Sequence, residues 1–332
     1  MSTSNLKIKW GIIGCGNIAG KFARDLALVT EAELTAVASR NKEKAKQFKI
    51  DHQAKKHYGN YNELLADPDI DIIYIATPHV SHAKWSILAM EQGKHVLCEK
   101  PLSINKKEAE EIIAASKRTG KFFMEALWTR FNPTFIAVKE LIEKGDLGAI
   151  KYIQADFTFK SDKPLESRVL DLALGGGTIL DIGIYPAFLS YSLMGIPEKI
   201  LAGAVFHKIT GCDMQSSMIF KYNTAQAVLY SSFETDSGIS AKIGGTEGTI
   251  HFHGSFHVPD GYTLIKNGVE TNFKIPFKGL GFTHEIEECH TCIRKGQKES
   301  KKWSHRDSLN LIGILDQVRA EVGLTYPQEK QH

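Results

Sequence analysis

The first strand, the glycine-rich turn after it and the following helix constrain the fold of this chain most. Residues 7–26 read KIKWGIIGCGNIAGKFARDL, an apolar strand followed by the G-x-G-x-x-A pattern and an amphipathic helix. Gly14 permits a tight turn, Gly16 lets the backbone approach a pyrophosphate, and Ala19 is small enough for close helix–strand packing. The helix N-terminus then presents unpaired N–H groups and the positive end of its dipole to phosphates. The predicted dinucleotide contacts in this turn are Gly14, Gly16, Asn17, Ile18 and Ala19.

The end of the second strand indicates which dinucleotide binds. The strand AELTAVASR ends about 20 residues after the glycines, where NAD-binding proteins carry an acidic residue that binds the ribose 2′-hydroxyl. Here the positions hold Ser39 and Arg40. A hydroxyl and a guanidinium suit a 2′-phosphate, so the sequence favours NADP over NAD. The alternative is that Arg40 only precedes a solvated helix.

Further apolar strands alternate with helices through residues 69–127. This alternation predicts a doubly wound parallel sheet with helices on both faces, a Rossmann domain. Ligands bind such sheets outside the carboxyl ends of the strands. We therefore expect the polar residues at two strand ends to line the nicotinamide site. They are Thr77, Pro78, His79 and His82 after one strand, and Glu99 and Lys100 after the next.

Composition excludes several other classes of protein. The 332 residues suffice for two domains, and the net charge is only +3. The lysine-rich runs lack interleaved aromatic residues, so no nucleic-acid partner is expected. No apolar run approaches the roughly 20 residues that span a bilayer, so no membrane partner is expected either. The five scattered cysteines predict no disulfide framework, and we expect a cytoplasmic protein.

The segment CHTC raises the possibility of a metal site. However, the apolar residues around it recur at helical spacing, which places Cys289 and Cys292 in a helix core. The pair His79 and His82 has no third ligand nearby in the sequence. We therefore predict no metal. The helical stripe runs through Phe282, Ile286, Cys289 and Ile293.

The second half of the chain has a different pattern. A helix is predicted in residues 131–148, followed by β-rich runs between residues 149 and 275 with Gly, Asn and Asp at their ends, and then by two helical stretches. The predicted domains are residues 1–125, a NAD(P)-binding Rossmann domain, and residues 126–332, a substrate-binding and oligomerisation domain.

Four motifs occur in the order of one known family. They are the G-x-G-x-x-A turn, TPHVSH, GKHVLCEKP and GGGTILDIGIYP, and together they resemble the Gfo/Idh/MocA family of nicotinamide-dependent oxidoreductases over nearly the whole chain. The segments MEALWTRFNP and DIGIYP look most like its trans-dihydrodiol dehydrogenase and NADP-dependent D-xylose dehydrogenase branch. The resemblance implies an α+β C-terminal domain with a large open, mostly antiparallel sheet. The outer face of that sheet commonly forms the oligomer contact, so we expect a homo-oligomer, either a dimer or a tetramer.

Hydride transfer from a carbinol requires a group that accepts the hydroxyl proton. The resemblance implies that Lys100 faces the nicotinamide and the hydroxyl, with Glu99 in support. Where many members have histidine, this chain has Tyr185, as in the dihydrodiol dehydrogenase branch. We expect Tyr185 to be the acid-base group, with Lys100 as its electrostatic partner. Asp181, four residues earlier, is expected on the same face of one helix, where it would bind a substrate hydroxyl or orient Lys100. The alternative is a core tyrosine and a solvated aspartate.

Three further residues are candidates for the substrate pocket. Trp128 would pack on the apolar face of a sugar or cyclic diol. Arg130 would contact a substrate oxygen or a cofactor phosphate, or form an interdomain salt bridge. Phe157 is a pocket-wall candidate, with core packing as the alternative. His79 and His82 are expected to shape the nicotinamide pocket.

The predicted activity is NADP-dependent hydride transfer between nicotinamide and a hydroxyl-bearing carbon of a sugar, cyclic polyol or trans-dihydrodiol. One alternative is a non-catalytic NAD(P)-sensing protein of the same fold. Another is an NAD-dependent enzyme that resembles inositol dehydrogenase. The catalytic set Lys100, Asp181 and Tyr185 disfavours the first alternative, and Tyr185 and Ser39 disfavour the second.

Overall fold

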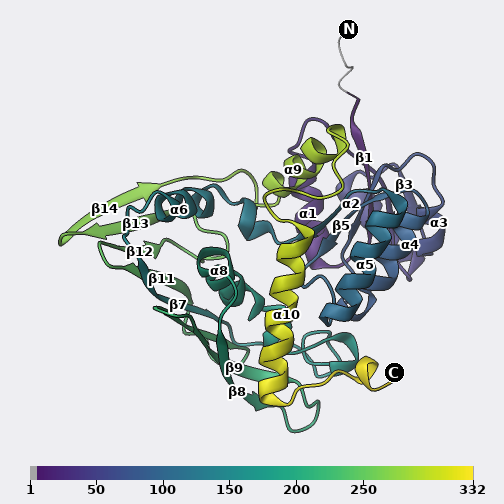
Figure 1. Cartoon of the computed structure of the whole chain (residues 1–332). Coiled ribbons are helices and arrows are strands. Elements are labelled where there is room, and N and C mark those ends of the chain that lie inside the picture. Colours follow the sequence, from purple (N-terminus) through teal and green to yellow (C-terminus); the bar gives the residue numbers. More distant parts are fainter. Residues whose placement is uncertain (1–5, 332) are drawn as a thin grey trace. The chain divides into compact units, whose positions relative to one another are not determined.

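The computed structural model describes residues 6–331, which divide into two compact units (Figure 1). The first unit contains the chain up to Ser103, Lys107–Trp128 and Lys278–Ser308. The second contains Ile104–Lys106, Thr129–Phe277 and the chain from Leu309 onward.

The described residues of the first unit form a six-stranded sheet in which all neighbouring strands are parallel. The strand order β3-β2-β1-β4-β5-β6 reverses direction between β1 and β4, which confirms the predicted Rossmann topology. The strands are β1 (Ile8–Ile13), β2 (Ala32–Ala38), β3 (Lys56–Tyr58), β4 (Ile72–Ile75), β5 (His95–Glu99) and β6 (Phe123–Ala126).

Helices follow these strands as the apolar patterns predict. Phe22 of the first helix stacks on Tyr74 of β4, with ring centroids 3.7 Å apart, and both side chains are fully buried. The helices of this unit are α1 (Asn17–Leu26), α2 (Lys42–His52), α3 (Tyr61–Leu65), α4 (His82–Glu91), α5 (Lys106–Thr119) and α9 (Thr283–Arg294), with 3₁₀ turns at η1 (His79–Ser81) and η2 (Trp128–Phe131).

The helix α9 belongs to the first unit, although the sequence analysis assigns all residues from 126 onward to the second domain. Specific contacts explain the difference. The indole N–H of Trp10 in β1 donates to Nε2 of His290 at 3.0 Å. Burial lowers the pKa of His290 to about 4, so its ring is neutral and can accept this bond. Asp25 of α1 also accepts N–H bonds from Leu280 and Phe282, directly before α9.

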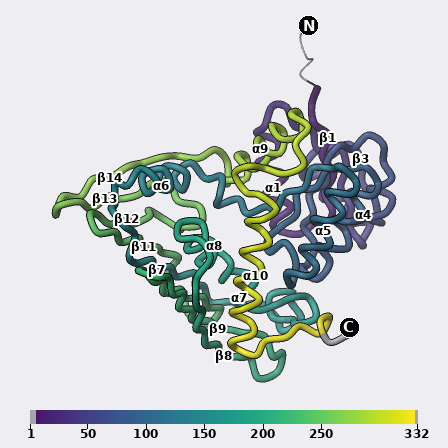
Figure 2. Tube along the Cα trace, viewed as in Figure 1, coloured from purple at the N-terminus to yellow at the C-terminus, as the bar shows by residue number. Residues whose placement is uncertain are grey.

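The described residues of the second unit form an eight-stranded sheet with the order β14-β13-β12-β11-β7-β10-β9-β8 (Figure 2). Among these strands β7 and β10 pair in parallel and all other neighbours are antiparallel, which confirms the predicted mostly antiparallel sheet. The strands are β7 (Ile150–Thr158), β8 (Lys199–Phe206), β9 (Asp213–Lys221), β10 (Gln226–Ser232), β11 (Ile239–Gly245), β12 (Thr249–Phe252), β13 (Gly261–Lys266) and β14 (Val269–Lys274).

Helices α6 and α8 lie on one face of this sheet (Figure 1), where α8 contacts β7 and β10. The helices of this unit are α6 (Pro133–Glu143), α7 (Thr178–Asp181) and α8 (Ile184–Met194). Helix α10 (His305–Val322) begins in the first unit and continues in the second. The short turns are η3 (Leu172–Leu174) and η4 (Pro327–Gln331).

The predicted single helix through Asp181 and Tyr185 is wrong. The chain breaks at Ile182 and Gly183, and the segments Leu172–Asp181 and Ile184–Met194 are bent by 48°. Gly183 passes so close to the preceding turn that a Cβ there would lie 2.8 Å from the carbonyl oxygen of Ile179. Asp181 therefore ends α7 and Tyr185 begins α8, so the two side chains do not share one helical face.

In the described part of the chain, no single helix is long and apolar enough to cross a membrane. The bent pair Leu172–Asp181 and Ile184–Met194 together is long and apolar enough, by length and composition only. The five cysteines are buried and form no disulfide. Cys289 and Cys292 are buried residues of α9, as predicted.

Candidate active site

The turn between β1 and α1 has the geometry that a pyrophosphate requires. Gly14 has φ +94°, and a Cβ there would lie 2.5 Å from the carbonyl oxygen of Ala76, so only glycine fits. A Cβ at Gly16 would meet no atom within 4 Å, so the space in front of this residue is open. Ala19 is fully buried against the sheet. Gly16 caps α1 without a side chain, which leaves Asn17 and Ile18 in the first helical turn where a phosphate would bind.

The end of β2 carries the two residues predicted to select the cofactor. Ser39 is buried, and its hydroxyl accepts the N–H of Asn41 at 3.2 Å, while Asn41 caps α2. Arg40 is exposed, and its charge acts on the hydroxyl of Tyr61, whose pKa is raised chiefly by burial. Neither Ser39 nor Arg40 carries a negative charge.

His82, the first residue of α4, contacts the segments that follow β4 and β5. One ring nitrogen of His82 lies 2.9 Å from the carbonyl oxygen of Thr77, and the other lies 2.8 Å from that of Pro101. His82 is fully buried, and the neighbouring His79 is also buried. The Thr77 hydroxyl is buried and has no hydrogen-bond partner among the described residues. An unsatisfied hydroxyl at the carboxyl end of a central strand fits a site for a polar ligand group.

Glu99 is the last residue of β5, and Lys100 follows it directly. The hydroxyl of Tyr74 donates a short hydrogen bond to Glu99, and the backbone N–H of Lys100 donates to its other oxygen at 3.2 Å. Glu99 is buried, whereas Lys100 is partly exposed. The peptide bond between Lys100 and Pro101 is cis. The structure thus brings Glu99 and Lys100 to the same sheet edge as the residues after β4.

Trp128 and Arg130 follow β6, as predicted. The ring of Trp128 stacks on Phe282, with centroids 4.5 Å apart and planes within 3°. Arg130 belongs to the second unit, where its guanidinium lies over the ring of Phe135 at 5.8 Å.

The second unit brings Tyr185 together with Phe157 and a residue that the sequence did not reveal. The Tyr185 ring is 5.3 Å from Phe157 and 5.1 Å from His257, and Phe157 and His257 are 4.7 Å apart. Tyr185 is 6% exposed, so most of its ring is inside this aromatic cluster. His257 comes from a loop about 70 residues later in the sequence, and no local motif marks it.

Asp181 has a cationic neighbour that sequence reasoning also missed. Nη1 of Arg168 donates to Oδ1 of Asp181 at 3.2 Å. The Arg168 side chain is 47% exposed and that of Asp181 only 10%, so the carboxylate is sheltered while the guanidinium reaches solvent. The predicted alternative of a solvated helix aspartate therefore does not apply to Asp181.

A buried aspartate supports the helix that ends in Asp181. Oδ2 of Asp213 in β9 accepts the hydroxyl of Thr178 and the N–H of Ile179, both at 2.7 Å. Gly177 has φ +119°, and a Cβ there would lie 2.0 Å from Oδ1 of Asp213. Burial raises the pKa of Asp213 to about 6. The close approach of Asp213 explains why Gly177 directly precedes α7.

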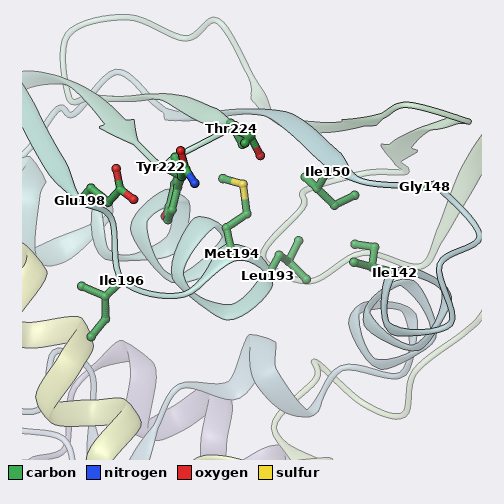
Figure 3. Close-up of a pocket in the computed structure, with 11 residues that line it drawn as sticks. Ile142, Gly148, Ile150, Leu193, Met194, Ile196, Glu198, Tyr222 and Thr224 are labelled. Atoms are coloured by element: carbon green, nitrogen blue, oxygen red, sulfur yellow. The ribbon is translucent and has the colours of Figure 1, made fainter.

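A separate hollow of about 520 Å³ lies in the second unit (Figure 3). None of the predicted site residues lines it, so it is distinct from the candidate active site. The side chains around it include Ile142, Ile150, Leu193, Met194, Ile196 and Tyr222.

Comparison with known proteins assigns the family. Residues 8–127 match the model of the oxidoreductase family with an NAD-binding Rossmann fold, and residues 135–251 match the GFO/IDH/MocA C-terminal domain. The chain belongs to the Gfo/Idh/MocA oxidoreductase family. It is 36% identical to trans-1,2-dihydrobenzene-1,2-diol dehydrogenase of Xenopus tropicalis, covering 96% of this chain and 99% of the relative. The Homo sapiens enzyme of that name is 33% identical, covering 98% of this chain and 100% of the relative.

Solved structures agree with this assignment. KijD10, a 3-ketoreductase from Actinomadura kijaniata in complex with NADP and TDP-benzene, matches with a TM-score of 0.87 and 26% identity over 95% of this chain and 98% of that one. A levoglucosan dehydrogenase shares the fold, with a TM-score of 0.86 and 20% identity over 96% of this chain and 97% of that one. The chain is therefore an NAD(P)-dependent dehydrogenase that acts on CH–OH groups, with a Rossmann domain for the cofactor.

Proposed function

We propose that this dehydrogenase uses NADP to oxidise, or in reverse to form, a secondary hydroxyl of a sugar, cyclic polyol or trans-dihydrodiol. The observation that carries the proposal is the placement of Lys100 at the carboxyl end of β5, on the sheet that also holds the dinucleotide turn. Names of relatives support the substrate class. They include trans-1,2-dihydrobenzene-1,2-diol dehydrogenases and a 3-ketoreductase solved with a TDP ligand.

In the proposed mechanism, the bound nicotinamide accepts or supplies the hydride. Tyr185 takes the hydroxyl proton during oxidation and returns it during reduction. Lys100 stabilises the negative charge that develops on the substrate oxygen. Asp181, sheltered and ion-paired with Arg168, accepts a hydrogen bond from a second substrate hydroxyl. The aromatic cluster of Phe157, Tyr185 and His257 excludes water around the phenol.

The preference for NADP rests on the end of β2. Arg40 is exposed, so its guanidinium is available to a phosphate, and Ser39 brings no charge that would repel one. The ketoreductase neighbour was solved with NADP, in agreement with this preference. NAD is the second candidate cofactor.

The first experiment is an activity panel that follows the absorbance of the reduced nicotinamide. NADP and NAD are each tested with pentoses, hexoses, inositols and trans-cyclohexanediol. We expect NADP-linked turnover, and a loss of roughly 10²–10⁴-fold in kcat for Tyr185→Phe with cofactor affinity retained. Lys100→Ala should also reduce kcat strongly. Turnover that survives both substitutions would contradict the assigned roles, and turnover with inositols and NAD alone would contradict the proposed specificity.

We also propose that the chain forms a homo-oligomer, a dimer or a tetramer, through the eight-stranded sheet. Apolar side chains on three neighbouring strands of that sheet are partly exposed: Leu201 of β8 pairs with Ile219 of β9, which pairs with Val228 of β10. Such a row is typical of a surface that another subunit covers. The cytoplasmic location stays a prediction of the sequence.

A further inference from the structure

Glu285 is a fully buried carboxyl group in the first turn of α9. Neither of its oxygens has a hydrogen-bond partner among the described residues. A carboxylate in such surroundings costs several kcal/mol to desolvate, so an arrangement of this kind contributes nothing to stability. Buried polar groups without partners are rare, and each calls for a functional explanation.

The neighbouring carboxyl groups are partnered in a way that Glu285 is not. Glu99 accepts hydrogen bonds from the Tyr74 hydroxyl and from the N–H of Lys100. Asp25 accepts the N–H groups of Leu280 and Phe282 at 2.8–2.9 Å. Glu99 and Asp25 each therefore have two hydrogen-bond donors. Glu285 lacks such donors, so it is the member of this group that most readily holds a proton.

The charges around Glu285 also favour its protonated form. Burial and the negative charges of Glu99 and Asp25 raise its pKa well above the ordinary value. The other titratable groups facing it are Tyr74 of β4 and Cys289 of α9, and burial keeps both in their neutral forms because it raises the pKa of each well above the ordinary value. The neutral, protonated form is therefore favoured for Glu285.

We propose that the protonation of Glu285 is coupled to cofactor binding. Glu285 is neutral in the free protein, and it releases its proton when the oxidised, positively charged nicotinamide binds beside Lys100. This inference rests on the proposed cofactor site. The reduced nicotinamide carries no ring charge, so it would not drive the release. Proton release and binding of the oxidised cofactor are then thermodynamically linked, and the preference for oxidised over reduced cofactor rises with pH.

Calorimetric titration of NADP⁺ and of NADPH into the full chain tests this linkage. Titrations in pairs of buffers with different ionisation enthalpies, between about pH 6 and pH 9, give the number of protons released per cofactor bound. Both cofactors carry the 2′-phosphate, so its titration cancels in the difference between them. We expect wild type to release more protons with NADP⁺ than with NADPH, by up to about one proton. Glu285→Gln, which is uncharged at every pH, should lose this difference.

The matched control is Glu287→Gln, an exposed glutamate two residues further along α9. It should behave as wild type. An unchanged difference in Glu285→Gln, or equal proton release for both cofactors in wild type, would overturn the inference while leaving the cofactor site intact. Failure of every nicotinamide cofactor to bind would overturn the cofactor site and the inference together.

A second measurement uses wild type alone, in case the Gln variant does not fold. Infrared difference spectra between the free protein and its NADP⁺ complex report the C=O stretch of a protonated carboxyl group that lacks hydrogen bonds. We expect this band in the free protein and its loss on addition of NADP⁺ but not of NADPH. A band that persists in the NADP⁺ complex would contradict the inference.

Discussion

Among single residues, Asp213 shows how a buried carboxyl can support a site at a distance. It does not belong to any predicted motif, yet it holds the first turn of α7 and thereby the position of Asp181. Its pKa is raised by burial from 3.8 to about 6. Because its pKa is higher in the folded state, the protonated Asp213 carboxyl stabilises the folded state relative to the ionised form. This stabilisation is fully present below about pH 4 and is lost as the pH rises through 6.

Asp213→Asn should remove this dependence of folding stability on pH. Asn can place its oxygen where Oδ2 accepts the bonds from Thr178 and Ile179, and its NH₂ at the position of Oδ1, which has no partner among the described residues. Relative to wild type, the variant should gain roughly 1–3 kcal/mol of stability between pH 4 and pH 7. Urea unfolding at both pH values measures this. A constant difference between the proteins would show that Asp213 does not titrate in this range.

Arg40 gives a second prediction for a single residue. If its guanidinium binds the 2′-phosphate, Arg40→Ala should raise the Kd for NADP by about 10-fold or more, because a charge-assisted hydrogen bond is lost. The Kd for NAD should hardly change. Fluorescence titration with both cofactors measures the ratio of the Kd for NADP to the Kd for NAD. The exposed Lys42→Ala serves as the control. Equal effects on NADP and NAD would contradict the assignment.

At the level of elements, the strands of the six-stranded sheet could be predicted because they are buried on both faces and therefore apolar throughout. The break between α7 and α8 could not, because Ile182 and Gly183 sit in an apolar pattern that continues across it. His257, Arg168 and Asp213 reach the site through tertiary packing, and the sequence gives no sign of that packing. The residues predicted from motifs lie instead where a strand end or a glycine-rich turn fixes their position.

Glu125 of β6 yields a prediction for the attachment of elements. This buried carboxylate accepts the N–H of Leu102, the indole N–H of Trp303 and the hydroxyl of Ser308 at 2.7–3.0 Å. Glu125→Gln presents an NH₂ group to one or more of these donors, so we expect a loss of about 1–3 kcal/mol. Urea unfolding measures the loss, and Glu111→Gln at an exposed position of helix α5 serves as a control. A variant as stable as wild type would show that these bonds contribute little net stability.

For the whole molecule, the partly exposed row on the eight-stranded sheet predicts how subunits separate. Ile219→Asp places a charge at the centre of the row formed with Leu201 and Val228. We expect the variant to be monomeric in light scattering coupled to size-exclusion chromatography, with an unchanged circular dichroism spectrum. Ile50→Asp, at an exposed apolar residue of the first unit, should leave the oligomer intact. A monomeric wild type would refute the proposal.

The return of residues 278–308 to the first unit has a consequence for synthesis on the ribosome. The partners of Trp10 and Asp25 lie more than 250 residues later in the chain. Domains generally fold from the N-terminus as they emerge, but this nucleotide-binding unit cannot close its core until almost all of the chain has been translated. Until then the nascent chain exposes the side of β1 and α1 that α9 later covers. A chaperone that binds apolar surface can therefore bind the first unit for most of the time that the chain is being translated.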